Sequence, residues 1–542
     1  MKGCNVRTKP DATPEYTYLP GSEEKAKLKA EIDRQYNDFV EVPCIIDGKE
    51  IFTGNTIDMI IPYDHKHVLG KVHLAGKKEL EMAKESSLRA HKMWEATPYE
   101  ERFAIFEKIA DTLLAEPHRL RVTAATLMNQ ASVIAQAEGD GGTGIADMII
   151  YDMYSASRII ADQPDDLANA NMTTEWRPLE GFVAAITPFN YVSDAANLAA
   201  APAVVGNTVI WKPSSKSILS NYYAMVAMMD GGLPAGVINF VPCVSELFTD
   251  EIVDDPDLAA INFIGSTPTF KVLWKRVAQS LDKYKNYPRM LGETGGKNYM
   301  FAYKDCDREG LISALIRGAY EFQGEKCSAT SRAYIHEDVW ADIKEGLIAG
   351  INSLKTGPAS DFTSFMSAVI GQESFDEIKE YIDRANASDE VEVLCGGYDD
   401  SEGYYIYPTL IESPRYDYET MVDEIFGPIL SVYTYNDNQL EETLDVLDTI
   451  TPYGLTGAVM CSDREVLQKL VDRLRYTSGV IYCNEKSTGA SPRYIPFGGS
   501  RMSGTNDKPG TVGNLIHFVT PRTIKDTTVI QKDWGWPLQV EE

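Results

Sequence analysis

The chain has 542 residues, more than one hydrophobic core usually serves, so two or three domains are expected. Its hydrophobic content of 44% and charged content of 24% are those of an ordinary globular protein. Asp and Glu number 80 against 51 Lys and Arg, a net charge of −29, and such a surface repels nucleic-acid phosphates and anionic lipid. We therefore expect neither nucleic acid nor a membrane as a partner.

The cysteines and the apolar segments bear on the cellular compartment of the protein. Eight cysteines form no CxxC pair and no dense disulfide pattern, which suits free thiols in a reducing compartment. No apolar run approaches the ~18 residues that cross a bilayer, and the N-terminus lacks the apolar core of a secretory signal. We expect a soluble intracellular protein, cytoplasmic because no clear presequence is visible, or in the mitochondrial matrix if the source is eukaryotic. The histidines have no companion ligand cluster, so no metal site is expected.

The first part of the chain is predicted to be mainly helical. Residues 1–60 are expected to form an irregular arm with one helix at about 22–36, where charges alternate in sign. Glu138 lies in a later helical segment, where a carboxylate is by itself typical of a solvent-exposed face. Four glycines then fall within residues 139–144, but their spacing matches neither common phosphate-binding fingerprint. This stretch is predicted to be a loosened helix or a loop.

Short apolar runs alternate with segments of helix length from about residue 180. They lie at 181–186, 208–211, 237–241 and 260–264, and they predict a parallel sheet with helices on both faces. After the last run, Ser266 is a natural helix N-cap whose neighbouring backbone amides suit a pyrophosphate. Lys212 places a cation at the end of another strand. Because the GxGxxG fingerprint is absent, these features alone leave open an α/β fold that binds no nucleotide.

A second strand–helix series, at about 299–482, contains Cys327. The thiol follows Gly324-Glu325-Lys326, where the glycine is expected to let the backbone come close to a neighbouring segment. A neighbouring cation lowers the pKa that controls a cysteine nucleophile. Taken alone, the segment favours a buried small side chain over a nucleophile. Glu293 lies upstream beside a double glycine, and a glycine-rich segment at 496–504 is expected to close over a site.

Six short blocks resemble, in order and spacing, those of the aldehyde dehydrogenase superfamily. They are Thr187-Pro188-Phe189-Asn190, Trp211-Lys212-Pro213-Ser214, Phe263-Ile264-Gly265-Ser266, Glu293-Thr294-Gly295-Gly296-Lys297, Gly324-Glu325-Lys326-Cys327 and Glu424-Ile425-Phe426-Gly427-Pro428. Within the family, the chain is most similar to the branch that oxidises glutamate γ-semialdehyde, the open form of pyrroline-5-carboxylate. This closer resemblance covers nearly the whole chain after about residue 15 and rests on residues 181–186, 295–298, 326–329, 486–489 and 503–510.

The resemblance implies an α/β fold with two doubly wound αβα domains and a small β oligomerisation flap. Residues 1–165 would form an N-terminal arm and the first part of a Rossmann-like NAD-binding domain, which residues 181–298 complete. Residues 299–503 would form the catalytic domain with the thiol. Part of the flap would come from residues 166–180, and the C-terminal tail, 504–542, is expected to pair with the sheet edge of another subunit.

The family also implies the catalytic roles. Cys327 would attack the aldehyde carbon, and the side-chain amide of Asn190 with the backbone N–H of Cys327 would hold the developing oxyanion. After hydride transfer to NAD, Glu293 would act as the general base that activates water against the thioester. Oxidation followed by hydrolysis needs all three groups around one carbon atom, which is why they come from different loops.

Cofactor and substrate residues carry over in the same way. NAD is expected, with NADP tolerated because Ser215 stands where many relatives have a ribose-binding glutamate. The implied cofactor-binding residues are Thr187, Pro188, Phe189, Lys212, Ser214, Gly265, Ser266, Glu424 and Phe426. The implied substrate-binding residues are Glu138 for the amino group, Ser328, Gly489 and Ala490 for the α-carboxylate, and Phe189 and Phe497 for the aliphatic part. Gln323 and Glu325 depart from the residues usual in relatives, which affects the electrostatics near the thiol.

The leading hypothesis is therefore the NAD-dependent oxidation of glutamate γ-semialdehyde to glutamate, the second step of proline catabolism. A dehydrogenase for another semialdehyde, a non-catalytic protein on the same scaffold, and a thioesterase or acyltransferase that uses Cys327 are the alternatives. A homodimer or larger homo-oligomer is implied, and proline dehydrogenase is left open as a partner.

Overall fold

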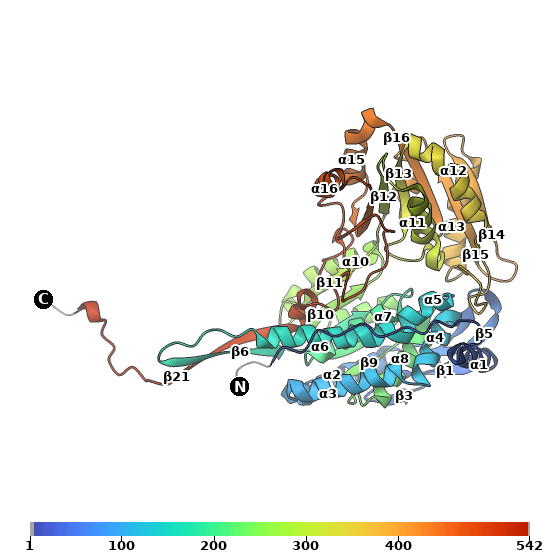
Figure 1. Ribbon diagram of the computed structural model, residues 1–542. Coiled ribbons are helices and arrows are strands. Elements are labelled where there is room, and N and C mark those ends of the chain that lie inside the picture. The colour runs from blue at the N-terminus through green and yellow to red at the C-terminus, as the bar shows by residue number, and fades with distance from the viewer. Residues whose placement is uncertain (1–4, 540–542) are drawn as a thin grey trace.

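The computed structural model describes residues 5–539, which are built around two seven-stranded sheets (Figure 1). Each sheet has helices on both faces, and a two-stranded ribbon projects from the body (Figure 1). The predicted α/β fold, with two αβα units and a small β flap, is confirmed. No helix among the described residues is long and apolar enough to cross a membrane.

The first sheet contains the four strands that the apolar runs predict. Its order is β11 (Arg289–Glu293), β10 (Leu258–Ile264), β7 (Phe182–Ile186), β8 (Thr208–Lys212), β9 (Ile238–Phe240), β2 (Cys44–Ile46) and β3 (Lys49–Ile51). The strands from β11 to β9 run parallel, whereas β2 is antiparallel to both β9 and β3. The carboxyl ends of β8, β10 and β11 therefore share one edge, where Lys212, Ser266 and Glu293 lie.

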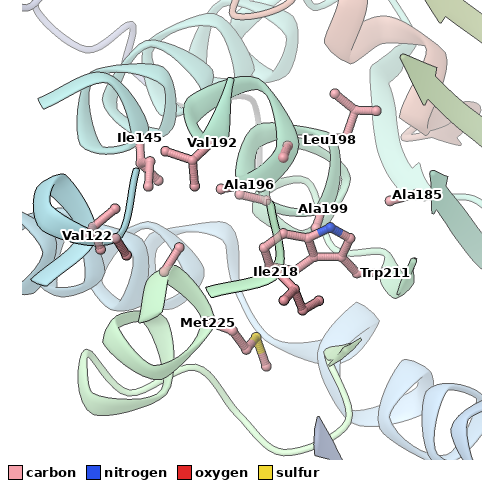
Figure 2. Close-up of a cluster of buried hydrophobic side chains, with 14 of the residues drawn as sticks. Val122, Ile145, Ala185, Val192, Ala196, Leu198, Ala199, Trp211, Ile218 and Met225 are labelled. Carbon is pink, nitrogen blue, oxygen red and sulfur yellow. The ribbon is translucent and has the colours of Figure 1, made fainter. Parts of the chain in front are cut away.

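Successive residues of these strands enter two different apolar cores. Val183 and Ala185 of β7 pack toward α7 (Val192–Val204) and α8 (Ile218–Asp230), while Phe182 and Ala184 face α2 (Lys77–Ala96) and α10 (Thr267–Gln279). Figure 2 shows the first core, where small alanines of α7 lie between the sheet and the outer helices. The outer helices include α1 (Glu23–Asn37), α3 (Tyr99–Leu114), α4 (His118–Asn129) and α6 (Ile145–Ala161). These alanines hold α7, and the loop before it, close to the sheet.

The second sheet has the order β14 (Glu392–Asp399), β15 (Tyr405–Glu412), β16 (Ile429–Tyr435), β13 (Thr330–His336), β12 (Asn298–Ala302), β18 (Thr456–Met460) and β19 (Val480–Cys483). All neighbours run parallel except β14, which is antiparallel to β15. Helices α11 (Arg308–Tyr320) and α12 (Glu337–Asn352) cover one face, and α15 (Leu440–Thr449) and α16 (Arg464–Arg473) cover the other. Helix α13 (Gln372–Ala387) packs beside β14 and β15.

The projecting ribbon pairs two segments that lie far apart in the sequence. Strand β6 (Ala170–Pro178) runs antiparallel to β21 (Val519–Thr527), and the tail continues beyond β21 away from the body (Figure 1). Within this chain, the C-terminal tail thus pairs with β6. The predicted pairing with another subunit remains a prediction.

The N-terminal segment is more regular than the sequence suggested. The helix expected at about 22–36 is confirmed as α1, with the Ser22 hydroxyl accepting from Lys25 N at 3.3 Å. The expectation of an otherwise irregular arm over residues 1–60 is wrong. Short strands β1 (Val40–Val42), β2, β3 and β4 (Thr56–Ile61) lie there, and β1 and β4 join β5 (Asp64–His73) in a small sheet. Three-residue strands are too short to show an alternating pattern.

Candidate active site

A strained loop carries Cys327. After α11 the chain makes one 3₁₀ turn, Glu321–Gly324, in which Phe322 and Gln323 both have φ of 54°. Gly324 follows with φ of 67°, and a methyl group on it would lie 2.4 Å from the carbonyl oxygen of Gly427. Non-glycine residues in the left-handed region cost about 1 kcal/mol or more each, and such strain is often found at active sites. The close backbone approach expected at Gly324 is confirmed.

The Cys327 thiol is partly buried and lies among carboxylates. The backbone carbonyl oxygen of Cys327 accepts a hydrogen bond from Asn298 Nδ2 at 2.7 Å. Burial raises the pKa of the thiol, and the charges of Asp194, Glu293 and Glu424 raise it further. In the unliganded protein the thiol is therefore protonated at neutral pH.

Lys326 does not activate the neighbouring thiol, contrary to the expectation from its position. Its Nζ makes a buried ion pair with Glu321, 2.9 Å long. Glu321 also pairs with Lys486 Nζ at 2.8 Å and with Arg317 Nε at 2.7 Å. Burial raises the pKa of Glu321, but the two lysines outweigh burial and lower it to about 2. Glu321 thus ties the loop that carries Cys327 to the loop that begins at Lys486.

Asn190 lies in the loop between β7 and α7, beside the Cys327 loop. Its Nδ2 donates to the carbonyl oxygen of Glu325 at 3.0 Å. Gln130 Nε2 in turn donates to the carbonyl oxygens of Phe189 and Asn190, at 2.7 and 3.0 Å. Asn190 Nδ2 carries two hydrogens, so one of them remains for a further acceptor.

Glu293 ends β11 under the glycine-rich segment. Its Oε2 accepts from the backbone N–H of Gly499 at 2.6 Å, and Oε1 has no hydrogen bond among the described residues. Burial raises the pKa of this carboxyl well above its usual value. Methyl groups on Gly498 and Gly504 would come within 3.0 and 2.9 Å of its oxygens. The segment 496–504 thus lies against this carboxyl; that it closes over a reaction site remains a prediction.

The double glycine after Glu293 touches both Cys327 and Glu424. A methyl group on Gly296 would lie 2.8 Å from the carbonyl oxygen of Cys327, and one on Gly295 would lie 2.0 Å from Glu424 Oε2. Glu424 Oε1 accepts from Gly296 N at 2.7 Å, and burial raises the pKa of Glu424 to about 7. The segments of Glu293, Cys327 and Glu424 thus meet at one place.

The other predicted cofactor residues line the edge of the first sheet and its loops. Phe189 and Phe426 make an edge-to-face ring contact with centroids 5.7 Å apart, and the Thr187 hydroxyl accepts from Trp211 Nε1 at 3.1 Å. Ser266 caps α10 as expected, accepting from Thr269 N at 3.3 Å. Pro188, Ser214 and Gly265 occupy the adjoining turns.

The donors at this edge fit a dinucleotide. The Lys212 ammonium has no hydrogen bond or ion pair within residues 5–539. Burial lowers its pKa. At the N-terminus of α10, Pro268 has no N–H, and the N–H groups of Thr269 and Phe270 already donate to Ser266. The N–H of Thr267 and the positive end of the helix dipole are left to face a pyrophosphate.

The predicted substrate residues fall into two groups. Ser328 Oγ lies 2.7 Å from Thr488 Oγ1, next to exposed Gly489 and Ala490, and Phe497 is partly buried in the glycine-rich segment. Glu138 lies elsewhere, in the π-helix Glu138–Gly144, which confirms the loosened helix predicted there. Its reading as a solvent-exposed carboxylate is wrong, because only 1% of the residue is exposed.

Both oxygens of Glu138 are occupied. Oε1 accepts from the backbone N–H of Tyr16 at 3.1 Å and is ion-paired with Arg119, while Oε2 accepts from the Tyr18 hydroxyl at 2.6 Å. These partners come from the N-terminal segment and α4. Whether Glu138 also contacts an amino group of the substrate remains a prediction.

Comparisons with known proteins agree with this geometry. The family model described as "Aldehyde dehydrogenase family" matches residues 51–524. Mitochondrial delta-1-pyrroline-5-carboxylate dehydrogenase of Dictyostelium discoideum is 40% identical over 99% of this chain and 97% of its own length. The human mitochondrial delta-1-pyrroline-5-carboxylate dehydrogenase is 40% identical over 96% of this chain and 93% of its own. The chain belongs to the aldehyde dehydrogenase family.

A solved member of the family has the same architecture. The crystal structure of the Delta-pyrroline-5-carboxylate dehydrogenase from Mycobacterium tuberculosis bound with NAD has a TM-score of 0.95 at 39% identity, with all of both chains covered. The resemblance to aldehyde dehydrogenases that six sequence blocks suggested is therefore confirmed.

Several residues of the candidate site were assigned no role from the sequence, although Lys508 lies in a block that carries the resemblance. Glu321, Gln130 and Lys508 hold its loops together; Lys508 Nζ donates to the carbonyl oxygens of Gly479 and Gly498 at 2.8 and 3.1 Å. Asp194 belongs to no motif, yet its charge acts on both Cys327 and Glu293. Only a three-dimensional arrangement brings such residues to the site.

Proposed function

We propose that this aldehyde dehydrogenase oxidises glutamate γ-semialdehyde, in equilibrium with pyrroline-5-carboxylate, to glutamate with reduction of NAD. The observation that carries the proposal is the meeting of the Cys327, Glu293 and Asn190 segments beside the exposed donors of the loop at Thr488–Ala490. Relatives with the same activity in their names support the substrate, since they match almost the whole chain at about 40% identity.

Cys327 begins the reaction by losing its proton and bonding to the aldehyde carbon. Because burial and neighbouring carboxylates raise the pKa of the thiol, proton removal needs a base. Glu293 can act as that base, since its Oε1 has no hydrogen bond among the described residues and burial raises its pKa. The second hydrogen of Asn190 Nδ2 and the N–H of Cys327 hold the oxyanion that forms. NAD, when bound, accepts the hydride that leaves the carbon.

Glu293 releases the first proton to solvent and then acts a second time. The thioester on Cys327 must be attacked by water, and a carboxylate with one free oxygen, held in place through the other by Gly499 N, can orient that water and take its proton. The carbon–sulfur bond breaks, glutamate leaves, and Cys327 recovers its proton. The Ser328 and Thr488 hydroxyls and the N–H groups of Gly489 and Ala490 would hold the α-carboxylate, and Phe189 and Phe497 the aliphatic part.

For NAD, we assign Lys212 to the adenosine ribose, the α10 N-terminus with Ser266 to the pyrophosphate, and Glu424 to the nicotinamide ribose. The proposed NAD-binding domain comprises residues 1–165 and 181–298, and the catalytic domain 299–503.

We further propose a homo-oligomer joined through the β6–β21 ribbon, because an isolated two-stranded ribbon is only marginally stable. The seven cysteines among the described residues are free, which supports a reducing compartment.

Formation of NADH from pyrroline-5-carboxylate, with NADP in parallel and a panel of simple alkyl aldehydes, tests the proposal. We expect the highest kcat/KM with pyrroline-5-carboxylate and NAD. A clear preference for alkyl aldehydes would refute the substrate. Hydrolysis of p-nitrophenyl esters with no NADH from any aldehyde would instead favour the thioesterase alternative.

A further inference from the structure

Asp194 is a carboxylate of α7 that the reaction described above does not use. It lies in the first turn of α7, four residues after Asn190, whose side-chain amide donates to the carbonyl oxygen of Glu325 in the Cys327 loop. The helix start does not need it, because Asp140 already accepts from Val192 N at 2.9 Å and from Ser193 N at 2.8 Å. Asp140 also accepts from the Ser193 hydroxyl at 2.5 Å. A capping role therefore does not explain Asp194.

The Asp194 side chain has no partner of its own. Within residues 5–539 its carboxylate makes no hydrogen bond and no ion pair, although the residue is partly buried. A partly buried carboxylate is usually paired or hydrogen-bonded, but the Asp194 oxygens are not among the buried side-chain atoms without a partner, so a ligand can reach them. This carboxylate is the exception among the acidic groups nearby, because Asp140, Glu138 and Glu321 all have several partners.

Its charge is directed at the reacting groups. Of all charged residues, Asp194 acts most strongly on the pKa of the Cys327 thiol, ahead of Glu293 and Glu424. It also raises the pKa of Glu293. The geometry agrees, because Asp194 begins α7 directly after the loop whose Asn190 contacts the Cys327 loop.

We propose that Asp194 binds the α-ammonium group of the substrate and so selects amino semialdehydes over aldehydes that lack an amine. This inference rests on the proposed function. The ammonium group of the substrate needs a carboxylate as its partner. Glu321 and Glu138 are already paired with Lys326 and Arg119. The free carboxylate of Asp194 is therefore the group able to form a new charge-assisted hydrogen bond.

The ammonium would have a second effect. Burial, with the charge of Asp140, raises the pKa of Asp194 to about 7, so above neutral pH the negative charge of Asp194 opposes formation of the thiolate. A cation bound to Asp194 offsets this charge, so a correct substrate would ease the ionisation of the nucleophile that attacks it. An aldehyde without an amine would leave the repulsion in place.

A pair of aldehydes that differ only in the amine tests the proposal. The kcat/KM ratio of glutamate γ-semialdehyde to 5-oxopentanoate should fall about 30-fold in Asp194→Asn, which keeps the shape and removes the charge. Asp194→Glu should restore part of the ratio. An unchanged ratio in Asp194→Asn would overturn the proposal.

Glu138→Gln separates Asp194 from the residue to which the family resemblance assigns the amine. If Asp194 binds the amine, Glu138→Gln should lower the melting temperature, because Arg119 loses its buried partner, and the ratio should not fall. Asp147→Asn, at a carboxylate that accepts from Thr13 N and the Thr13 hydroxyl, is the matched control and should leave the ratio as it is. A ratio that falls in Glu138→Gln but not in Asp194→Asn would assign the amine to Glu138 instead.

A measurement on the wild-type enzyme covers the case in which the Asp194 variants do not fold. L-Glutamate should inhibit about 10-fold more tightly than glutarate, which lacks the amine; equal inhibition constants would refute the role of Asp194. If the wild-type enzyme forms no NADH from pyrroline-5-carboxylate, the proposed function fails before any variant is compared.

Discussion

Replacing Glu321 by Gln should disturb both stability and catalysis, because this carboxylate joins the Cys327 loop to the Lys486 loop. Removing one partner from a buried ion pair typically costs about 3–5 kcal/mol. Here Lys326 can relieve part of that cost: burial already lowers its pKa to about 8, so it can lose its proton when the carboxylate is gone. We therefore expect the free energy of unfolding to fall by about 2–3 kcal/mol.

The catalytic effect follows from the same loss. The hydrogen bonds of Ser328 and Thr330 to the Lys486 loop remain, but without the ion pairs the spacing between the thiol and the carboxylate-binding donors is less fixed, and kcat/KM should fall about 10–100-fold. Urea unfolding and steady-state kinetics measure the two effects. Glu380→Gln, which breaks an exposed pair with Arg384, is the control and should cost less than about 0.5 kcal/mol.

The pH dependence of the free energy of unfolding tests whether the charge of Glu321 is the cause. The pKa of Glu321 is lowered to about 2, so its contribution to stability is complete above the unfolded value near 4.3 and is lost as the pH falls toward 2. The stability gap between wild type and Glu321→Gln should therefore narrow below about pH 4.3. A variant that loses less than about 1 kcal/mol and keeps its kcat/KM would refute the linking role of Glu321.

The remaining predictions concern the reacting groups and the cofactor. Cys327→Ser should lower NADH formation at least ~10³-fold while NAD still binds by calorimetry, and retained turnover would remove the nucleophile assignment. Glu293→Gln should give a burst of NADH followed by slow turnover as the thioester accumulates, and an unaltered steady state would mean that another base acts. Gly295→Ala should displace Glu424, since the added methyl group would lie 2.0 Å from its carboxylate, and weaken NAD about 10-fold in titrations; unchanged affinity would contradict the ribose contact.

The sequence predicted the parts of the fold that depend on local pattern. The strands β7, β8, β9 and β10 lie within two residues of their apolar runs, because strands buried on both faces must be continuously apolar. The close backbone contact at Gly324 could also be predicted, because a glycine before a nucleophile often lets two backbone segments approach each other. The neighbouring segment is the one that contains the carbonyl of Gly427.

The parts that the sequence did not reveal depend on distant partners. Glu138 looks like any helix carboxylate until Tyr16, Tyr18 and Arg119 are brought to it from two other segments. Lys326 looks like an activating cation until Glu321 neutralises it. Asp194 has no motif, and only the packing of α7 against the sheet brings its charge to Cys327. Electrostatics of this kind cannot be inferred from sequence spacing.

The alanines of α7 have a mechanical consequence. Helix α7 is wedged between a sheet and other helices, with no room for larger side chains, so it cannot slide or rotate without moving its neighbours (Figure 2). Because the amide that would stabilise the oxyanion sits just ahead of this helix, a single extra methylene deep in the apolar interior would shift that amide. Enlarging an alanine here to gain thermal robustness should therefore slow turnover, although the altered residue never touches the aldehyde.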